Sequence, residues 1–142
     1  MKRRVVHFFQ KYAFNPPIKL LFALGIAPRG YALLETTGAK TGKQRQIPVG
    51  NGLVGNEFWI VAEHGRKAAY VRNIERNPRV HVKVRDGNGL RWHEGSGQVL
   101  PGDDPRARQK WLAGKVPGAA KNAAAVSFFG TELLTVKITL ND

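Results

Sequence analysis

The stretch that decides the fold spans residues 33–49 and reads Leu-Leu-Glu-Thr-Thr-Gly-Ala-Lys-Thr-Gly-Lys-Gln-Arg-Gln-Ile-Pro-Val. Apolar and β-branched residues on either side of Gly38 and Gly42 favour two strands joined by a tight glycine turn. We expect the first strand at residues 31–37 and the second at residues 44–49. We call residues 31–49 the basic hairpin and residues 38–43 the hairpin tip.

Similar β signals recur along the rest of the chain. Runs of apolar residues, alternating or continuous, predict further strands at residues 57–62, 80–85, 90–100 and 134–140. Helices are expected at residues 68–77, ending before Pro78, and from Asp104-Pro105 to Lys115. Because turns join most of these six strands and helices do not alternate with them, the pattern predicts a mainly β (α+β) antiparallel barrel.

The N-terminal part of the chain has a different pattern. Residues 3–13 have apolar side chains at helical spacing, Pro16-Pro17 ends that helix, and residues 17–24 predict another. Such helices either pack over the hydrophobic core or form a basic amphipathic segment that lies on anionic lipid headgroups. We expect one domain over residues 1–142, with a helical segment at residues 1–28 and the barrel at residues 29–142.

The chain is strongly basic, with a net charge of +13. Residues 1–48 hold nine Lys or Arg and one acidic residue, a net of +8. Nucleic acid, an anionic membrane surface or a phosphorylated small molecule would each be attracted, and charge alone does not choose among them. No cysteine, apolar spanning segment or clear signal-peptide cleavage site is visible. We therefore expect a cytoplasmic protein, with membrane association left open.

Several functional motifs are present only in part. Residues 50–55 match Gly-x-Gly-x-x-Gly, but a strand is expected after them, so we interpret these glycines as turn residues. Residues 38–43 lack the spacing of a P-loop, and the four histidines lack that of a zinc site, so no metal site is predicted. Trp59, Trp92 and Trp111 lie in patterns that predict burial, which argues against stacking on nucleic-acid bases.

The hairpin tip itself allows two interpretations. Backbone amides at a glycine turn, together with Lys40, Lys43 and Arg45, can surround an anion. The simpler alternative is a basic hairpin whose tip is only solvated. The residues of the tip alone do not separate the two.

The basic hairpin closely resembles the deazaflavin-dependent nitroreductase family, whose members use coenzyme F420. The family pattern, roughly L-L-x-T-x-G-x-K-T-G-x-x-R-x-x-P-L, is met from Leu33 to Pro48, with Val49 in place of the last leucine. A second similar block runs from Ile60 to Val80 in the family's order of strand, glycine turn, helix, Asn-Pro and strand. Together the two blocks are specific.

The resemblance implies a six-stranded antiparallel split β-barrel that binds a deazaflavin ring and its long anionic tail. It implies contacts to the tail from the hairpin tip and Arg45, with Pro48, Val49 and Tyr70 beside the ring. Gly65 and its neighbours would approach the tail from the other side. The expected cofactor-binding residues are Lys40, Thr41, Gly42, Lys43, Arg45, Gln46, Ile47, Pro48, Val49, Ala62, Glu63, His64, Gly65, Ala69 and Tyr70.

The activity implied by the resemblance is F420-dependent reduction of a small acceptor such as a quinone, a nitro compound or an activated alkene. FMN or FAD on the same barrel is the nearest alternative. A nucleic-acid-binding module and a cofactor carrier without turnover are alternatives of other classes. No catalytic residue is predicted, because water can supply the proton, and the oligomeric state stays open, a homodimer included.

Two positions and one segment depart from the family pattern. Ala39 and His64 stand where basic residues are frequent, and Arg66 and Lys67 could supply the missing charge. Residues 116–129 carry two phenylalanines but none of the tyrosines that well-known members have next to the substrate. Cofactor binding is therefore better supported by the resemblance than reduction of any particular compound.

Overall fold

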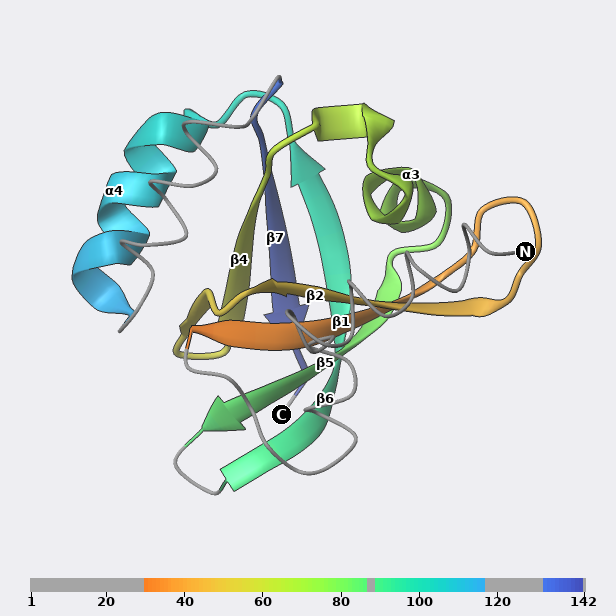
Figure 1. Ribbon diagram of the computed structural model, residues 1–142, viewed down its shortest axis with the longest axis horizontal. Coiled ribbons are helices and arrows are strands. Elements are labelled where there is room, and N and C mark those ends of the chain that lie inside the picture. Colours follow the sequence, from red (N-terminus) through yellow and green to blue (C-terminus); the bar gives the residue numbers. More distant parts are fainter. Residues whose placement is uncertain (1–29, 87–88, 117–131, 142) are drawn as a thin grey trace, which may run out of the picture.

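The computed structural model describes residues 30–86, 89–116 and 132–141 (Figure 1). The helices expected before residue 25 and most of the tyrosine-free segment lie outside these residues. The described strands form one antiparallel sheet in the order β2-β1-β5-β6-β7-β4-β3. The strands are β1 (Tyr31–Thr37), β2 (Gln44–Gly50), β3 (Leu53–Val54), β4 (Glu57–Ala62), β5 (Arg79–Asp86), β6 (Gly89–Leu100) and β7 (Leu134–Leu140).

The sheet is strongly curled. Figure 1 shows β1 and β2 running across the direction of β4 and β7, although all of these strands belong to the same sheet. β2 forms one edge of the sheet, and β3 with β4 forms the other. This half-barrel agrees with the mainly β antiparallel fold expected from the sequence, and it leaves two strand edges available to border a site.

Strands β1 and β2 form the predicted hairpin, paired from Tyr31–Gly50 to Thr37–Gln44. At its tip the amide of Gly38 donates a hydrogen bond of 2.7 Å to the carbonyl of Lys43. Gly42 has a φ angle of 71°, which residues with a Cβ rarely adopt. Gly42 therefore has a conformational reason, and a Cβ at Gly38 would lie 2.9 Å from Oγ1 of Thr41, so both glycines of the tip suit the turn that the sequence indicated.

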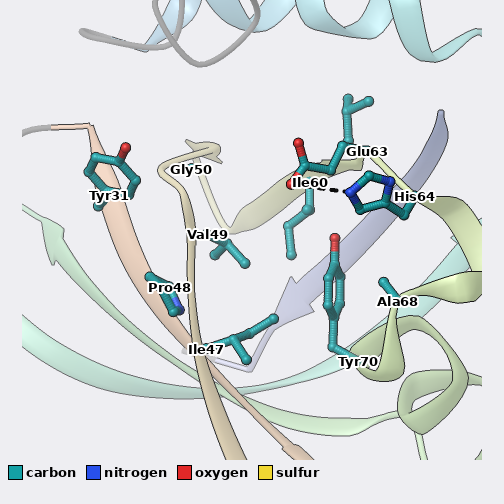
Figure 2. Close-up of a pocket in the computed structure, with 11 residues that line it drawn as sticks. Tyr31, Ile47, Pro48, Val49, Gly50, Ile60, Glu63, His64, Ala68 and Tyr70 are labelled. Carbon is teal, nitrogen blue, oxygen red and sulfur yellow. Dashed lines mark ion pairs between the residues drawn. The ribbon is translucent and has the colours of Figure 1, made fainter. Parts of the chain in front are cut away.

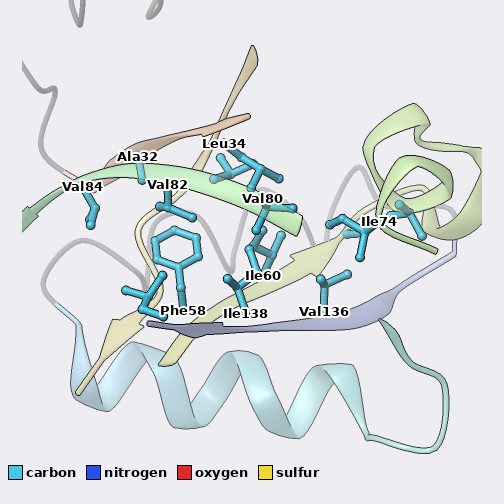
Figure 3. Packing of buried hydrophobic residues seen from close by; sticks show 14 of the residues in the cluster. Ala32, Leu34, Phe58, Ile60, Ile74, Val80, Val82, Val84, Val136 and Ile138 are labelled. Atoms are coloured by element: carbon cyan, nitrogen blue, oxygen red, sulfur yellow. The ribbon is translucent and has the colours of Figure 1, made fainter. Parts of the chain in front are cut away.

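The core lies on the concave face of the sheet. Alternation along the strands sends one side chain in two to this face, so Leu34, Phe58, Val82 and Ile138 are completely buried (Figure 3). Burial of such apolar side chains is the main stabilising contribution to the fold.

Two short helical elements follow β4: the 3₁₀ helix η1 (Gly65–Lys67) and helix α3 (Ala69–Arg76). Helix α3 sends Val71 and Ile74 into the core. A Cβ at Gly97 of β6 would lie 2.8 Å from Cγ2 of Ile74, so this glycine allows the helix to approach the sheet closely.

Helix α4 (Pro105–Lys115) begins where the sequence predicts, because the carboxylate of Asp104 accepts hydrogen bonds from the amides of Arg106 and Ala107. It packs on the convex side of β4, where Trp59, Leu112 and Val116 form a second apolar cluster. None of the described helices is long and apolar enough to span a membrane.

Some predictions about the strands and tryptophans were wrong. The described sheet has seven strands and not six, because the two residues of β3, too few to show alternation, pair with the start of β4. Trp92 was expected to be buried but is 41% exposed, because its neighbour His93 takes the inward position on β6. Trp111 is only half-buried, and the turn η1 was not expected.

Candidate functional site

A pocket of about 430 Å³ lies between the two edge regions of the curled sheet, with β2 on one side and β4 on the other (Figure 2). Tyr31 of β1, Tyr70 of α3 and residues of the β4–α3 connection complete it. Its lining consists of Tyr31, Ile47, Pro48, Val49, Gly50, Ile60, Val61, Glu63, His64, Ala68 and Tyr70. The curl of the sheet therefore brings together side chains that are up to 39 positions apart in the sequence.

One wall of the pocket is apolar. Ile47 and Val49 project from β2, and Ile60 lies opposite them on β4 (Figure 2). Pro48 has no amide hydrogen, and β2 tolerates it because this edge strand pairs with β1 alone. Apolar side chains that face each other across a pocket suit an aromatic ring system.

The opposite end of the pocket is polar. Nε2 of His64 lies 4.0 Å from Oε1 of Glu63, and both side chains are about half exposed. The hydroxyl of Tyr70 points toward this pair (Figure 2). Burial, and then the negative charge of Glu63, raise the pKa of Tyr70 well above its usual value, so its hydroxyl keeps its proton at neutral pH.

Gly65 directly follows Glu63 and His64, and its backbone conformation helps to set where they lie. Its φ angle is 53°, and a Cβ there would lie 3.0 Å from the carbonyl oxygen of Glu132. The amide of Glu132 donates a hydrogen bond of 3.2 Å to the carbonyl of Glu63. The guanidinium of Arg72 donates hydrogen bonds to the carbonyls of Arg66 and Lys67, both at 2.8 Å. These bonds satisfy the last carbonyl groups of η1.

The hairpin tip and the start of β2 are exposed and positively charged. Within residues 30–86, 89–116 and 132–141, Lys40, Lys43 and Arg45 form no ion pair. Arg45 lies on the same face of β2 as Ile47 and Val49, so its side chain leaves the strand on the pocket side. Unpaired cations next to an apolar pocket can attract the anionic part of a ligand.

The tip is attached to helix α3 rather than extending into solvent by itself. The amide of Ala39 donates a hydrogen bond of 2.9 Å to Oδ1 of Asn73. Inside the tip, Oγ1 of Thr41 accepts from the amide of Lys43 at 3.3 Å. The position of the cations therefore depends on α3 as well as on the hairpin.

The structure brings some of the expected site residues together and separates others. Six of them line the pocket: Ile47, Pro48, Val49, Glu63, His64 and Tyr70. The side chain of Gln46 instead donates to Glu35 at 2.8 Å on the convex face, and Ala62 is buried in the core. The remaining expected residues all lie outside the lining: Lys40, Thr41, Gly42, Lys43 and Arg45 on the hairpin, Gly65 in η1 and Ala69 at the start of α3.

Five lining residues were missed by the sequence analysis: Tyr31, Gly50, Ile60, Val61 and Ala68. Tyr31 and Gly50 pair directly at the end of the hairpin. Their place follows from the strand register. Following the paired strands from the tip to the other end of the hairpin would therefore have identified both residues as part of the site. Ile60 and Val61 required the curl of the sheet, which no local pattern contains.

Comparison with known proteins assigns the chain to a family. The family model described as F420H(2)-dependent quinone reductase matches residues 19–137. A solved structure of an F420-H2 dependent reductase, FDR-A, is 27% identical, with a TM-score of 0.55 and coverage of 78% of this chain and 94% of that chain. No curated protein is similar enough to count as a match.

Two further solved structures are similar in fold alone. One, described as a domain-swapped dimer, is 22% identical, with a TM-score of 0.57 and coverage of 98% of this chain and 99% of that chain. The other, the heme storage protein HutZ from Vibrio cholerae, is 10% identical, with a TM-score of 0.57 and coverage of 89% and 92%. With the family match over most of its length, this chain belongs to the F420H(2)-dependent quinone reductase family and is an F420-dependent reductase.

Proposed function

We propose that this protein reduces a quinone with hydride from reduced F420, and that the pocket between β2 and β4 is where the reaction occurs. The observation that carries the proposal is that the strand β2, which lines a largely apolar pocket, also carries Arg45 and leads from the tip with its unpaired Lys40 and Lys43. A coenzyme with a flat ring and an anionic tail needs both features next to each other.

The residues present fit the ring of the coenzyme. Ile47, Val49 and Ile60 offer an apolar surface, and Tyr70 adds an aromatic side chain at its edge. Contact with these groups would remove the ring from water and restrict its orientation. When bound, the reduced coenzyme supplies the hydride.

The residues of the hairpin fit the anionic tail. Lys40, Lys43 and Arg45 are exposed, and no described carboxylate neutralises them. We propose that they bind the phosphate and carboxylate groups, helped by the amides and the hydroxyl around Gly42. Lys67, on the other side of the pocket, is a further candidate, whereas Arg66 already pairs with Glu75 at 3.1 Å.

The experiment that tests this function is an anaerobic assay with reduced F420 and a water-soluble naphthoquinone. We expect coenzyme oxidation to depend on both protein and quinone. A nitroaromatic compound and an activated alkene are the comparison acceptors, and faster reduction of either one would assign a different substrate class. A yellow protein as purified, with a flavin spectrum, would instead favour FMN or FAD.

The N-terminal segment suggests where such a reaction could occur. We propose that residues 1–28 bring the protein to an anionic membrane surface from the cytoplasmic side, since their basic and apolar residues suit lipid headgroups. Sedimentation with anionic vesicles, but not with neutral vesicles, is the expected result. A single domain over residues 1–142 and a homodimer remain proposals, to be checked by one calorimetric transition and by light scattering.

A further inference from the structure

The pocket contains four side chains able to carry a proton: Tyr31, Glu63, His64 and Tyr70. Reduction of a quinone to a hydroquinone adds a proton as well as a hydride. A proton donor placed beside the acceptor would accelerate that addition.

One of these four side chains, that of His64, is of the type that readily exchanges a proton near neutral pH. Phenols and carboxyl groups ordinarily titrate near about 10 and about 4, so the former hold their proton and the latter have already lost it. For Tyr70, burial and Glu63 strengthen this tendency by raising the pKa further. Imidazole is the side chain that both gains and loses a proton between about pH 5 and 8.

The geometry around His64 suits proton donation. Its side chain is 48% exposed at the mouth of the pocket, so one side can meet water while the other faces the cavity. Oε1 of Glu63 lies 4.0 Å from Nε2. Figure 2 shows the ring above the hydroxyl of Tyr70, at the end of the pocket opposite Pro48.

We propose that His64 is the general acid of quinone reduction, an inference that rests on the proposed function. One N–H bond of its imidazolium breaks and an O–H bond of the hydroquinone forms. Two electrons pass to the quinone with the hydride, which comes from the reduced coenzyme. The neutral imidazole then regains a proton from water through its exposed side, so atoms and charges balance over the cycle.

The described segments next to His64 carry further charged and titratable groups. Glu63 comes from the connection after β4, Arg66 and Lys67 from η1, Tyr70 from α3, and Glu132 from the segment before β7. Arg66 is paired with Glu75. Among the described residues, Glu63 has a carboxylate oxygen 4.0 Å from Nε2 of His64.

The test compares His64→Gln with the matched variant His81→Gln. His81 is a strand residue on the convex face, where Glu35 and Glu94 lie 3.6 Å and 3.8 Å from its nitrogens, and it is absent from the pocket lining. For each protein we would measure F420 binding by fluorescence and kcat with the naphthoquinone from pH 5 to 9. NMR of the protein without coenzyme would follow the imidazole resonance that His64→Gln removes.

If His64 is the general acid, the kcat of His64→Gln, measured at saturating F420, is lower on the order of 10²-fold than that of the wild type. The wild-type kcat falls as the pH rises through the range in which the NMR resonance titrates, and this dependence is lost in His64→Gln and kept in His81→Gln. An unchanged kcat and pH profile in His64→Gln would refute the inference, as would a His64 resonance that does not titrate between pH 5 and 8. Wild-type protein that fails to bind F420 would instead refute the proposed function.

Discussion

The side-chain amide of Asn73, on helix α3, donates a hydrogen bond of 3.0 Å to the hydroxyl of Thr36, on strand β1. The carbonyl oxygen of the same side chain accepts from the amide of Ala39. One buried asparagine therefore connects the helix that carries Tyr70 to the base of the hairpin tip. The apolar and the cationic parts of the site are positioned by a shared contact.

Asn73→Ala is expected to lower the free energy of unfolding by about 1–3 kcal/mol, because it leaves buried polar partners without a hydrogen bond. It should also weaken F420 binding by releasing the tip. Urea denaturation and a fluorescence titration measure the two effects. Asn77→Ala, at the end of the same helix, is the control, since Asn77 accepts only from the exposed amide of Arg79. Equal effects of the two substitutions would contradict this role of Asn73.

Lys40→Ala and Arg45→Ala are each expected to raise the Kd for F420 about tenfold, because each removes one charge-assisted contact. The loss should shrink as the salt concentration rises, since ionic contacts are screened. Arg85→Ala provides a matched loss of one exposed cation on β5, and it should leave the Kd unchanged. If all three variants bind alike, the tail does not lie on the hairpin.

Phe58→Ala is expected to lower the free energy of unfolding by about 3–5 kcal/mol, because Phe58 is completely buried in the main core. Trp92→Ala removes a larger side chain, but one that is 41% exposed, so it should cost much less. Denaturation of the two variants under the same conditions measures the difference. A larger loss for Trp92→Ala would show that the convex face around it is covered in solution.

Gly65→Ala is expected to destabilise the protein by about 1–2 kcal/mol, because alanine is strained at a positive φ angle. The added Cβ would also press on the carbonyl of Glu132, so Glu63 and His64 should move and kcat should fall. Gly102→Ala is the matched control, since a Cβ added there would meet no atom within 4 Å and its φ angle is not positive. Thermal unfolding measures the loss of stability, and the quinone assay measures the fall in kcat.

Asp103 gives the stability of the protein a dependence on acid pH. A hydrogen bond from Arg108 is the main cause that lowers the pKa of Asp103, while burial opposes it. Because the pKa is lower in the folded state than in the unfolded state, the stabilisation is present above about pH 4 and is lost as the pH falls through the folded pKa. We expect Asp103→Asn to be less stable than wild type at pH 7 and to approach it near pH 2. A difference independent of pH, followed by urea denaturation, would contradict this assignment.

Much of the local structure could be predicted because it depends on neighbouring residues. A few adjacent residues are enough to predict the glycine turn of the hairpin tip, the alternation on β5 and β7, and the cap at Asp104. The exposure of Trp92 could not be predicted in this way, because which side of β6 faces the core depends on its partners.

By itself, the sequence determined the strands, the basic hairpin and the resemblance to F420-dependent reductases, since short-range spacing encodes all three. Only the tertiary structure decided which side chains share a pocket. Ile60 and His64 meet Ile47 and Val49 because a seven-stranded sheet curls until its two edge regions face each other. That curl arises from twist and packing summed over the whole sheet, and no single segment contains it.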